Sequence, residues 1–234
     1  MTFPKALPHE PLTRIVDGVY IVRGSFQMGA MRIGRTMTIV QSEATLTVLN
    51  AVRLSESAEA ELGKLGTVRH LIKLSDSHGV DEPYYVDRFK PEVWVAAASK
   101  SERVQGTRQL GPDSPIPGAI VLGYPGASGW CEHALWIPNA GGTLITCDAL
   151  QNHVDSVGAS WFGKVMTSMM GFKGGVIVAP MWRKYQKVHR DQVTAAFAEV
   201  APLKFENLIT GHGPALCGGA DQIVRATVQA ASSA

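Results

Sequence analysis

Apolar and polar positions along the chain form short strand-like runs, separated by segments in which apolar residues recur at helical spacing. The strand-like runs, bounded by glycine, proline or polar turns, are residues 18–24, 36–40, 44–52, 70–75, 93–98, 119–122, 133–137, 143–147 and 208–210. Helices are predicted at residues 55–65, 83–89, 161–170, 192–200 and 220–234. Because strand groups are followed by helices twice over, we expect two sheets packed face to face with helices outside.

The loops and the chain ends complete this organisation. Glycines and prolines predict loops at residues 27–34 and 105–118, and prolines predict an irregular arm at residues 1–13. No short-period repeat or low-complexity segment divides the chain. We therefore expect one domain over residues 1–234, which is long enough to bury a substantial core.

Three of the predicted strands end in side chains that bind metals or transfer protons. Asp148 directly follows one apolar strand, and His212 follows another, between two glycines. A third strand leads into the segment Asp76-Ser77-His78-Gly79-Val80-Asp81. Carboxylates and imidazoles at strand ends predict one site assembled from distant parts of the chain.

The composition argues against a membrane protein and against a nucleic-acid-binding protein. Apolar residues make up 45% of the 234 residues, and 22 basic against 20 acidic residues give a net charge of +2. This charge provides no electrostatic attraction for nucleic acid or an anionic membrane surface. No run of about 18 apolar residues is present that would span a membrane.

Cysteine usage and the N-terminal segment predict a cytoplasmic protein. The three cysteines, Cys131, Cys147 and Cys217, show no pairing pattern, which favours a reducing compartment. The N-terminal segment has prolines where a signal peptide needs an apolar core. Charged residues are 18% of the chain, below the usual ~25%, which favours an additional apolar surface such as a homodimer interface.

The order of these elements resembles the metallo-β-lactamase-fold superfamily over roughly residues 18–230. The resemblance depends on the strand pair, the helix and the polar strand end of the first half, followed by Leu144-Ile145-Thr146-Cys147-Asp148-Ala149 and Thr210-Gly211-His212-Gly213. It implies a four-layer αββα sandwich with the active site along one edge of the two sheets. Members commonly bind two metals, usually zinc or iron, and hydrolyse lactams, thioesters, phosphodiesters or glyoxalase-type thiol esters.

The superfamily's ligand pattern is matched only in part. Asp148 stands at the bridging carboxylate and His212 at the last histidine ligand. In the His-x-His-x-Asp-His motif, His78 falls on a matching histidine, while Asp76 replaces the first histidine, Val80 the aspartate and Asp81 the final histidine.

Two further positions depart from the superfamily, and two short patterns point to one of its branches. Ala127 of Tyr124-Pro125-Gly126-Ala127 stands where a third histidine is expected, and Asn50 stands where many members have an aspartate. The segment 65–70 and the Asp-x-x-x-Asn pattern at 148–152 are closest to a divergent, functionally uncharacterised branch.

These matches imply a hydrolase-like protein with a reduced, mononuclear metal site and a small-molecule substrate. The predicted ligands are Asp76, His78, Asp148 and His212, with His133 as a spare, and Asp81 and His212 are the candidates for proton transfer. An oxygen-rich set of this kind suits one ion of zinc, iron or manganese.

Each candidate residue also has a structural interpretation, which leaves two alternatives open. His212 and Asp148 can stabilise turns, segment 76–81 can be a solvated turn, and His133 can be a core histidine. Val80 and Ala127 in place of ligands favour a catalytically inactive descendant without metal, which serves as a binding or interaction module. In a third hypothesis, His212 and Asp148 form a metal-free acid/base dyad.

Three further features allow structural or functional interpretations. Segment 161–172 is apolar nearly all round and predicts a buried helix, or else a lid or dimer face. Segment 183–190 is basic and predicts a solvated surface, or else an anion-binding one. Cys147 precedes Asp148 and is expected on the opposite sheet face as a small buried hydrophobe.

Overall fold

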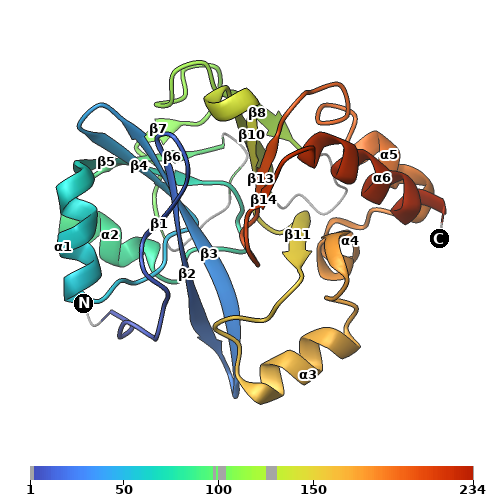
Figure 1. Ribbon diagram of the computed structural model, residues 1–234, viewed down its shortest axis with the longest axis horizontal. Helices are drawn as coiled ribbons and strands as arrows, with labels where there is room; N and C mark the ends of the chain where they lie inside the picture. Colours follow the sequence, from blue (N-terminus) through green and yellow to red (C-terminus); the bar gives the residue numbers. More distant parts are fainter. Residues whose placement is uncertain (1–2, 97–98, 100–103, 125–130, 234) are drawn as a thin grey trace.

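Two β-sheets pack face to face at the centre of the molecule, and helices cover their outer surfaces (Figure 1). The structure is a computed structural model that describes residues 3–96, 99, 104–124 and 131–233. In these ranges the first sheet has the strand order β1 (Thr13–Val16), β2 (Val19–Met28), β3 (Met31–Ser42), β4 (Thr45–Leu49), β5 (Thr67–Lys73), β6 (Glu92–Val95) and β7 (Arg108–Gln109). The second has the order β14 (Leu216–Cys217), β13 (Asn207–Ile209), β10 (Thr143–Ile145), β9 (His133–Ile137) and β8 (Ile120–Gly123).

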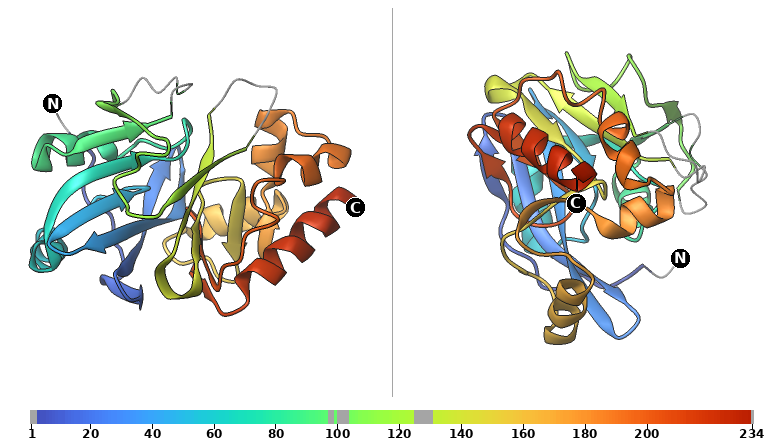
Figure 2. Two further views of the ribbon diagram at one scale, coloured as in Figure 1. Left: turned by 90° about the horizontal axis from the view of Figure 1, so that it is seen from above. Right: turned by 90° about the vertical axis from the view of Figure 1, so that its right-hand side faces the viewer.

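The helices form the two outer layers, as the sequence predicted. Helices α1 (Glu56–Leu65) and α2 (Glu82–Phe89) pack on the first sheet, and α4 (Pro180–Gln186), α5 (Val193–Ala196) and α6 (Ala220–Ser233) pack on the second. Viewed from above, the two sheets stand side by side between these helices (Figure 2). This arrangement confirms the four-layer αββα sandwich.

Three apolar layers hold these elements together, because successive strand residues point to opposite sheet faces. In β5, Leu71 packs toward α1 and α2, whereas Ile72 faces the second sheet. In β10, Leu144 packs toward α4–α6, whereas Ile145 faces the first sheet. These four side chains are fully buried, and each contributes roughly 1.5–3 kcal/mol.

The segment predicted as a loop at residues 27–34 is instead the tip of a long hairpin. Strands β2 and β3 stay paired as far as Met28 and Met31, and Gly29, with φ of 56°, lies in the turn. The tip is supported by the start of helix α3 (Trp161–Met169), where the Ser160 backbone N–H donates to the Arg32 carbonyl at 3.0 Å. This support comes from a segment about 130 residues away, and a local sequence pattern does not report it.

Helix α3 is exposed, so the prediction of a buried helix was wrong. Trp161 and Met169 are each 78% exposed, and Phe162 is 45% exposed. The helix contacts the hairpin through Gly163, where an added Cβ would lie 2.4 Å from the Arg32 carbonyl oxygen. Trp161, Phe162 and Met169 are therefore left exposed by the described residues.

Several short elements were not anticipated from the sequence. They are β1, β7, α4, and a small two-stranded sheet of β11 (Leu150–His153) and β12 (Gly175–Val178). Residues 3–12 have no regular secondary structure. None of the helices in the described part of the chain is long and apolar enough to cross a membrane.

Candidate metal centre

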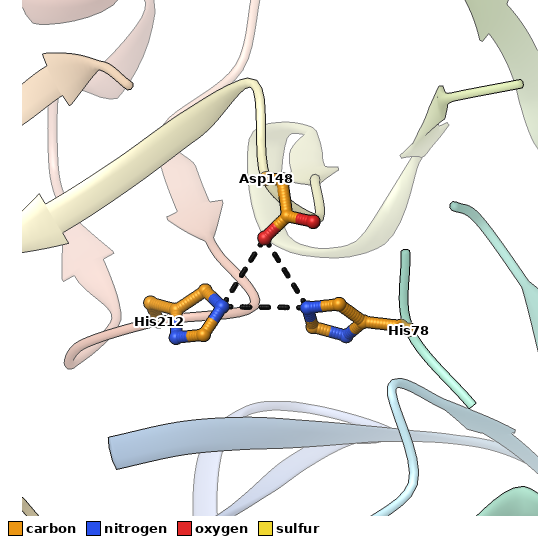
Figure 3. Close-up of side chains that lie close together, drawn as sticks. All are labelled: His78, Asp148 and His212. Atoms are coloured by element: carbon orange, nitrogen blue, oxygen red, sulfur yellow. Dashed lines mark hydrogen bonds and ion pairs between the residues drawn. The ribbon is translucent and has the colours of Figure 1, made fainter. Parts of the chain in front are cut away.

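His78, Asp148 and His212 meet at one end of the two sheets. Strands β10 and β13 are parallel neighbours, with Leu144 opposite Leu208 and Ile145 opposite Ile209. Parallel neighbours end at the same sheet edge, so the residues that follow them, Asp148 and His212, come together. His78 arrives from the first sheet, in the loop after β5 (Figure 3).

The three side chains present their ligand atoms to one another. Oδ1 of Asp148 lies 3.2 Å from Nε2 of His78 and 3.2 Å from Nε2 of His212, and the two nitrogens are 3.3 Å apart. Both histidines are only 8% exposed. In a tetrahedral zinc site with ligand distances of about 2.0–2.2 Å, neighbouring ligand atoms lie about 3.4 Å apart. The observed triangle therefore has the size of a metal site.

The tautomer of His212 supports this interpretation. Its Nδ1 lies 2.7 Å from the Gly34 carbonyl oxygen, which can only accept, so Nδ1 carries the hydrogen. In the neutral ring, Nε2 then presents a lone pair to a carboxylate oxygen of Asp148. Two acceptors at this distance need a cation or a proton between them. The residues present thus fit a metal ion, with His212 oriented in the way metal-bound histidines usually are.

Asp148 is charged in this environment. Burial alone would raise the pKa of Asp148, but His78 and His212 more than offset burial and hold the pKa well below its usual range. Ser77 adds a short hydrogen bond from its hydroxyl to Oδ2 of the same carboxylate. The cluster therefore offers one negative charge and two imidazoles.

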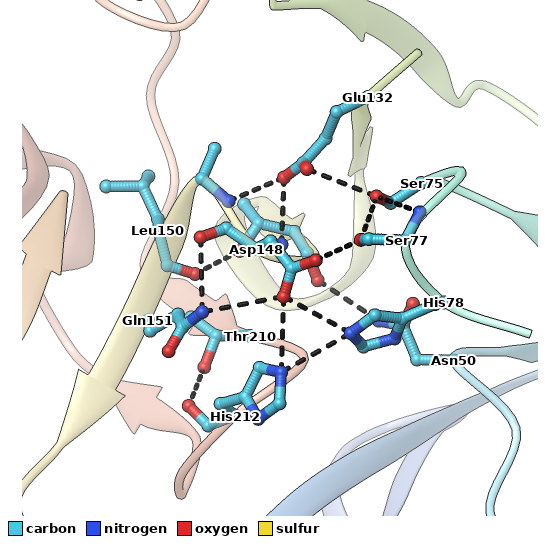
Figure 4. A network of polar contacts seen from close by, with 12 residues as sticks. Asn50, Ser75, Ser77, His78, Glu132, Asp148, Leu150, Gln151, Thr210 and His212 are labelled. Carbon is cyan, nitrogen blue, oxygen red and sulfur yellow. Dashed lines mark hydrogen bonds and ion pairs between the residues drawn. The ribbon is translucent and has the colours of Figure 1, made fainter. Parts of the chain in front are cut away.

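Glu132, which sequence reasoning missed, fixes the turn that carries Asp148 (Figure 4). Its Oε1 accepts from the backbone N–H groups of Asp148 at 2.8 Å and Ala149 at 2.5 Å. Its Oε2 accepts from the Ser75 hydroxyl at 3.2 Å. Burial and the charge of Asp148 raise the pKa of Glu132 well above its usual range.

Removing Glu132 is expected to destabilise this turn. Glu132→Ala leaves two backbone N–H groups without their acceptor, so we expect the free energy of unfolding to fall by about 2–4 kcal/mol. Glu132→Gln keeps an acceptor oxygen for the two N–H groups, so its loss should stay near about 1 kcal/mol. Urea unfolding followed by circular dichroism measures both variants; equal losses would contradict the role given to the Glu132 oxygen.

Gly213 sets the conformation of the loop that carries His212. Its φ is 97°, and an added Cβ would lie 1.6 Å from the Asn152 carbonyl oxygen. The Asn152 backbone N–H donates to the His212 carbonyl at 3.1 Å. Only glycine allows this close approach of two loops, so the glycines noted beside His212 have a structural reason.

Asp76 lies outside the three-residue cluster, although the sequence predicted it as a ligand. Its Oδ1 accepts from the Ser99 hydroxyl, and its Oδ2 accepts from the Cys131 backbone N–H at 3.0 Å. Both carboxylate oxygens are thus engaged with other groups, so the contacts favour a structural role.

Asp81, predicted to transfer protons, also lies outside the cluster. Its Oδ2 lies 2.9 Å from Nη2 of Arg35 and accepts from the Arg53 backbone N–H at 2.9 Å. The Arg35 and Asp81 side chains are 1% and 6% exposed. Asp81 is therefore half of a buried ion pair.

The remaining sequence candidates have other contacts. His133 lies on β9 with its Nδ1 3.5 Å from the Cys131 sulfur and is not part of the cluster. Asn50 donates to the Thr146 carbonyl at 3.2 Å. Cys147 is fully buried between the two sheets, as expected. Residues 125–127 of the Pro-Gly-Ala segment lie outside the described residues.

A cavity of about 250 Å³ opens beside the cluster. Its floor includes Asp148, His212 and Glu132. Its walls come from the tip of the β2–β3 hairpin, from the end of α3 and the turn after it, and from α4. The candidate ligands therefore border a cavity that is smaller than a drug-sized pocket but larger than the ~150 Å³ that holds benzene.

Comparison with known proteins gives no match to a family model or to a curated protein, but clear matches to solved structures. The metallo-β-lactamase FIM-1 from Pseudomonas aeruginosa, in its mono-zinc form, matches with a TM-score of 0.65 over 99% of this chain and 99% of its own, at 13% identity. A metallo-β-lactamase from Erythrobacter litoralis matches with a TM-score of 0.57 over 95% and 92%, at 13% identity. A fragment of putative diflavin flavoprotein A 5 from Nostoc sp. PCC 7120 matches with a TM-score of 0.61 over 98% and 95%, at 12% identity. The chain has the metallo-β-lactamase fold, and at these identities the likeness shows the fold alone.

Proposed function

We propose that the protein is a metal-dependent hydrolase of a small molecule, with one transition-metal ion held by His78, Asp148 and His212. The observation that carries the proposal is the triangle of ligand atoms, 3.2–3.3 Å apart, beside a cavity. Support also comes from the fold, since one similar structure was determined in a mono-zinc form. Zinc, iron and manganese suit this set of ligands.

The residues of the cluster have distinct roles in this proposal. When bound, the ion would lower the pKa of a water molecule and polarise a substrate carbonyl. Gly34 orients the His212 ring through Nδ1, so that Nε2 faces the site. Asp148 supplies the negative charge, and Glu132 and Ser77 hold its turn and its carboxylate in place. Asp76 and Asp81 stabilise the surrounding loops.

Metal analysis of the purified protein tests this proposal. Protein prepared without chelators should contain about one equivalent of a transition metal, because all three ligands are already positioned by the fold. Removing the metal with a chelator should abolish hydrolysis, and adding it back should restore activity. A content below roughly a tenth of an equivalent after incubation with zinc, iron and manganese would contradict the proposal.

A catalytically inactive binding module is the second candidate function. It is favoured by the contacts of Asp76 and Asp81, since two acids that the sequence offered to the site are engaged elsewhere. Metal at one equivalent together with hydrolysis would exclude it. Hydrolysis that persists after metal removal would instead support a His212–Asp148 dyad.

A further inference from the structure

The cavity above the metal ligands has apolar walls. Four methionines line it, Met28 and Met31 from the hairpin tip, Met170 after α3 and Met181 on α4. Phe172 and the buried Trp182 are further wall residues. The apolar part of the cavity therefore lies between three segments that come together only in the folded chain.

The charges around the cavity favour a neutral occupant. The described residues that line it include the carboxyl groups of Glu132 and Asp148 but no lysine or arginine. A carboxylate or phosphate on the part of the ligand that lies away from the proposed metal ion would enter an apolar space without a counter-charge in its walls, which is costly. An uncharged apolar group gains free energy there by burial.

The volume limits the size of that group. An apolar cavity of about 150 Å³ takes benzene in an engineered protein, so about 250 Å³ has room for roughly six to ten carbon atoms. Methionine side chains are flexible and polarisable, so walls with four of them adapt to linear as well as ring-shaped groups. The cavity thus selects for polarity and size more than for one shape.

We propose that the substrates are uncharged esters or related acyl compounds whose apolar part, of roughly six to ten carbons, occupies this cavity. That such a compound is hydrolysed rests on the proposed function; that the cavity binds the apolar part does not. In the hydrolysis, water adds to the acyl carbon, the bond to the leaving group breaks, and the water's protons are shared between the acid product and the leaving group.

Methionine-methyl NMR tests the binding step without requiring turnover. Octan-1-ol, added to protein labelled at the methionine methyl groups, should shift Met28, Met31, Met170 and Met181, while Met37 and Met166 stay unchanged. In metal-free protein, octanoate should bind at least about tenfold more weakly than octanol, because its carboxylate loses hydration in the cavity. Equal binding of octanol and octanoate, or octanol shifts outside the four cavity methionines, would overturn the proposal.

Two adjacent methionines provide a matched pair of variants. Met170 lines the cavity and is 39% exposed, whereas Met169 does not line it and is 78% exposed. Met170→Asp should weaken octanol binding about tenfold, because it places a short charged side chain in the wall. Met169→Asp should leave binding within about twofold, since its side chain points into solvent. Equal effects of the two variants would place the bound alcohol elsewhere.

The two proposals fail in different ways. With p-nitrophenyl esters, kcat/KM should rise from the acetate to the octanoate ester, and this rise should disappear in Met170→Asp. Octanol binding without any hydrolysis would refute the proposed function and retain the apolar site. Hydrolysis that is insensitive to chain length, without octanol binding, would refute the apolar site and retain the hydrolase.

Discussion

His212→Ala is expected to lower kcat/KM for ester hydrolysis by at least about 100-fold, because even changes to the partners of a metal ligand reduce metal affinity or activity about 10–100-fold. The variant removes one of three candidate ligand atoms and leaves Asp148 with a single imidazole partner. Metal content measured after dialysis should fall in parallel. Hydrolysis assays before and after addition of excess metal separate weaker binding from lost chemistry.

His153 offers a matched control for this experiment. It lines the same cavity, but its Nε2 lies 2.7 Å from Oε1 of Gln151 and it is not one of the cluster residues. Burial, followed by the nearby His212, lowers the pKa of His153 to about 4, so replacing it changes no charge at pH 7. His153→Asn should therefore keep its metal and kcat within a few-fold. If both histidine variants lost activity alike while keeping their metal, His212 would not be a ligand.

The strand-end pattern in the sequence predicted the three residues that the structure brings together. Asp148 and His212 each follow an apolar strand, and parallel pairing of these strands places both at one edge. The same pattern predicted His78, which enters from the other sheet. The layered fold was also predicted from the sequence, because strand and helix periodicity indicates which side chains are buried.

The sequence did not reveal the roles of residues whose partners lie far away in the chain. Glu132 acts on the Asp148 turn, and the segment carrying it meets the loop after β5 at an isolated bridge to Ser75. Arg35 is separated by 46 residues from Asp81. Hydrophobic periodicity carries no information about which charged groups pair. For this reason the sequence placed Asp76 and Asp81 at the site. It did not reveal that Asp76 accepts from Ser99 and Cys131, or that Asp81 pairs with Arg35.

The apolar helix α3 shows a second limit of sequence patterns. Apolar residues on all sides normally indicate burial. Here Trp161 and Met169 face solvent, and Met170, directly after the helix, forms part of a cavity wall. An apolar residue in the sequence can meet core, cavity or water, and only the fold distinguishes these cases.

Arg35→Met is expected to lower the free energy of unfolding by about 3–5 kcal/mol at pH 7, because it leaves the buried Asp81 without its charged partner. Burial already raises the pKa of Asp81, although Arg35 and the Arg53 N–H lower it. An acid with a raised folded-state pKa favours the folded state below its unfolded pKa of about 3.9, and this contribution is lost as pH rises. The deficit of Arg35→Met, measured by urea unfolding, should therefore be smaller at pH 4 than at pH 7.

Asp81→Asn separates a structural from a catalytic role for this residue. The amide keeps an oxygen for the Arg53 N–H but leaves the buried Arg35 guanidinium without its anionic partner, so in the wild-type background it should also cost about 3–5 kcal/mol. In the Arg35→Met background, Asp81→Asn should raise stability, because it removes the unpaired charge. If Asp81 were the catalytic base, Asp81→Asn would abolish kcat even under conditions in which the variant is fully folded. Because its carboxylate is paired with Arg35 and not with the metal ligands, we expect kcat to stay within a few-fold.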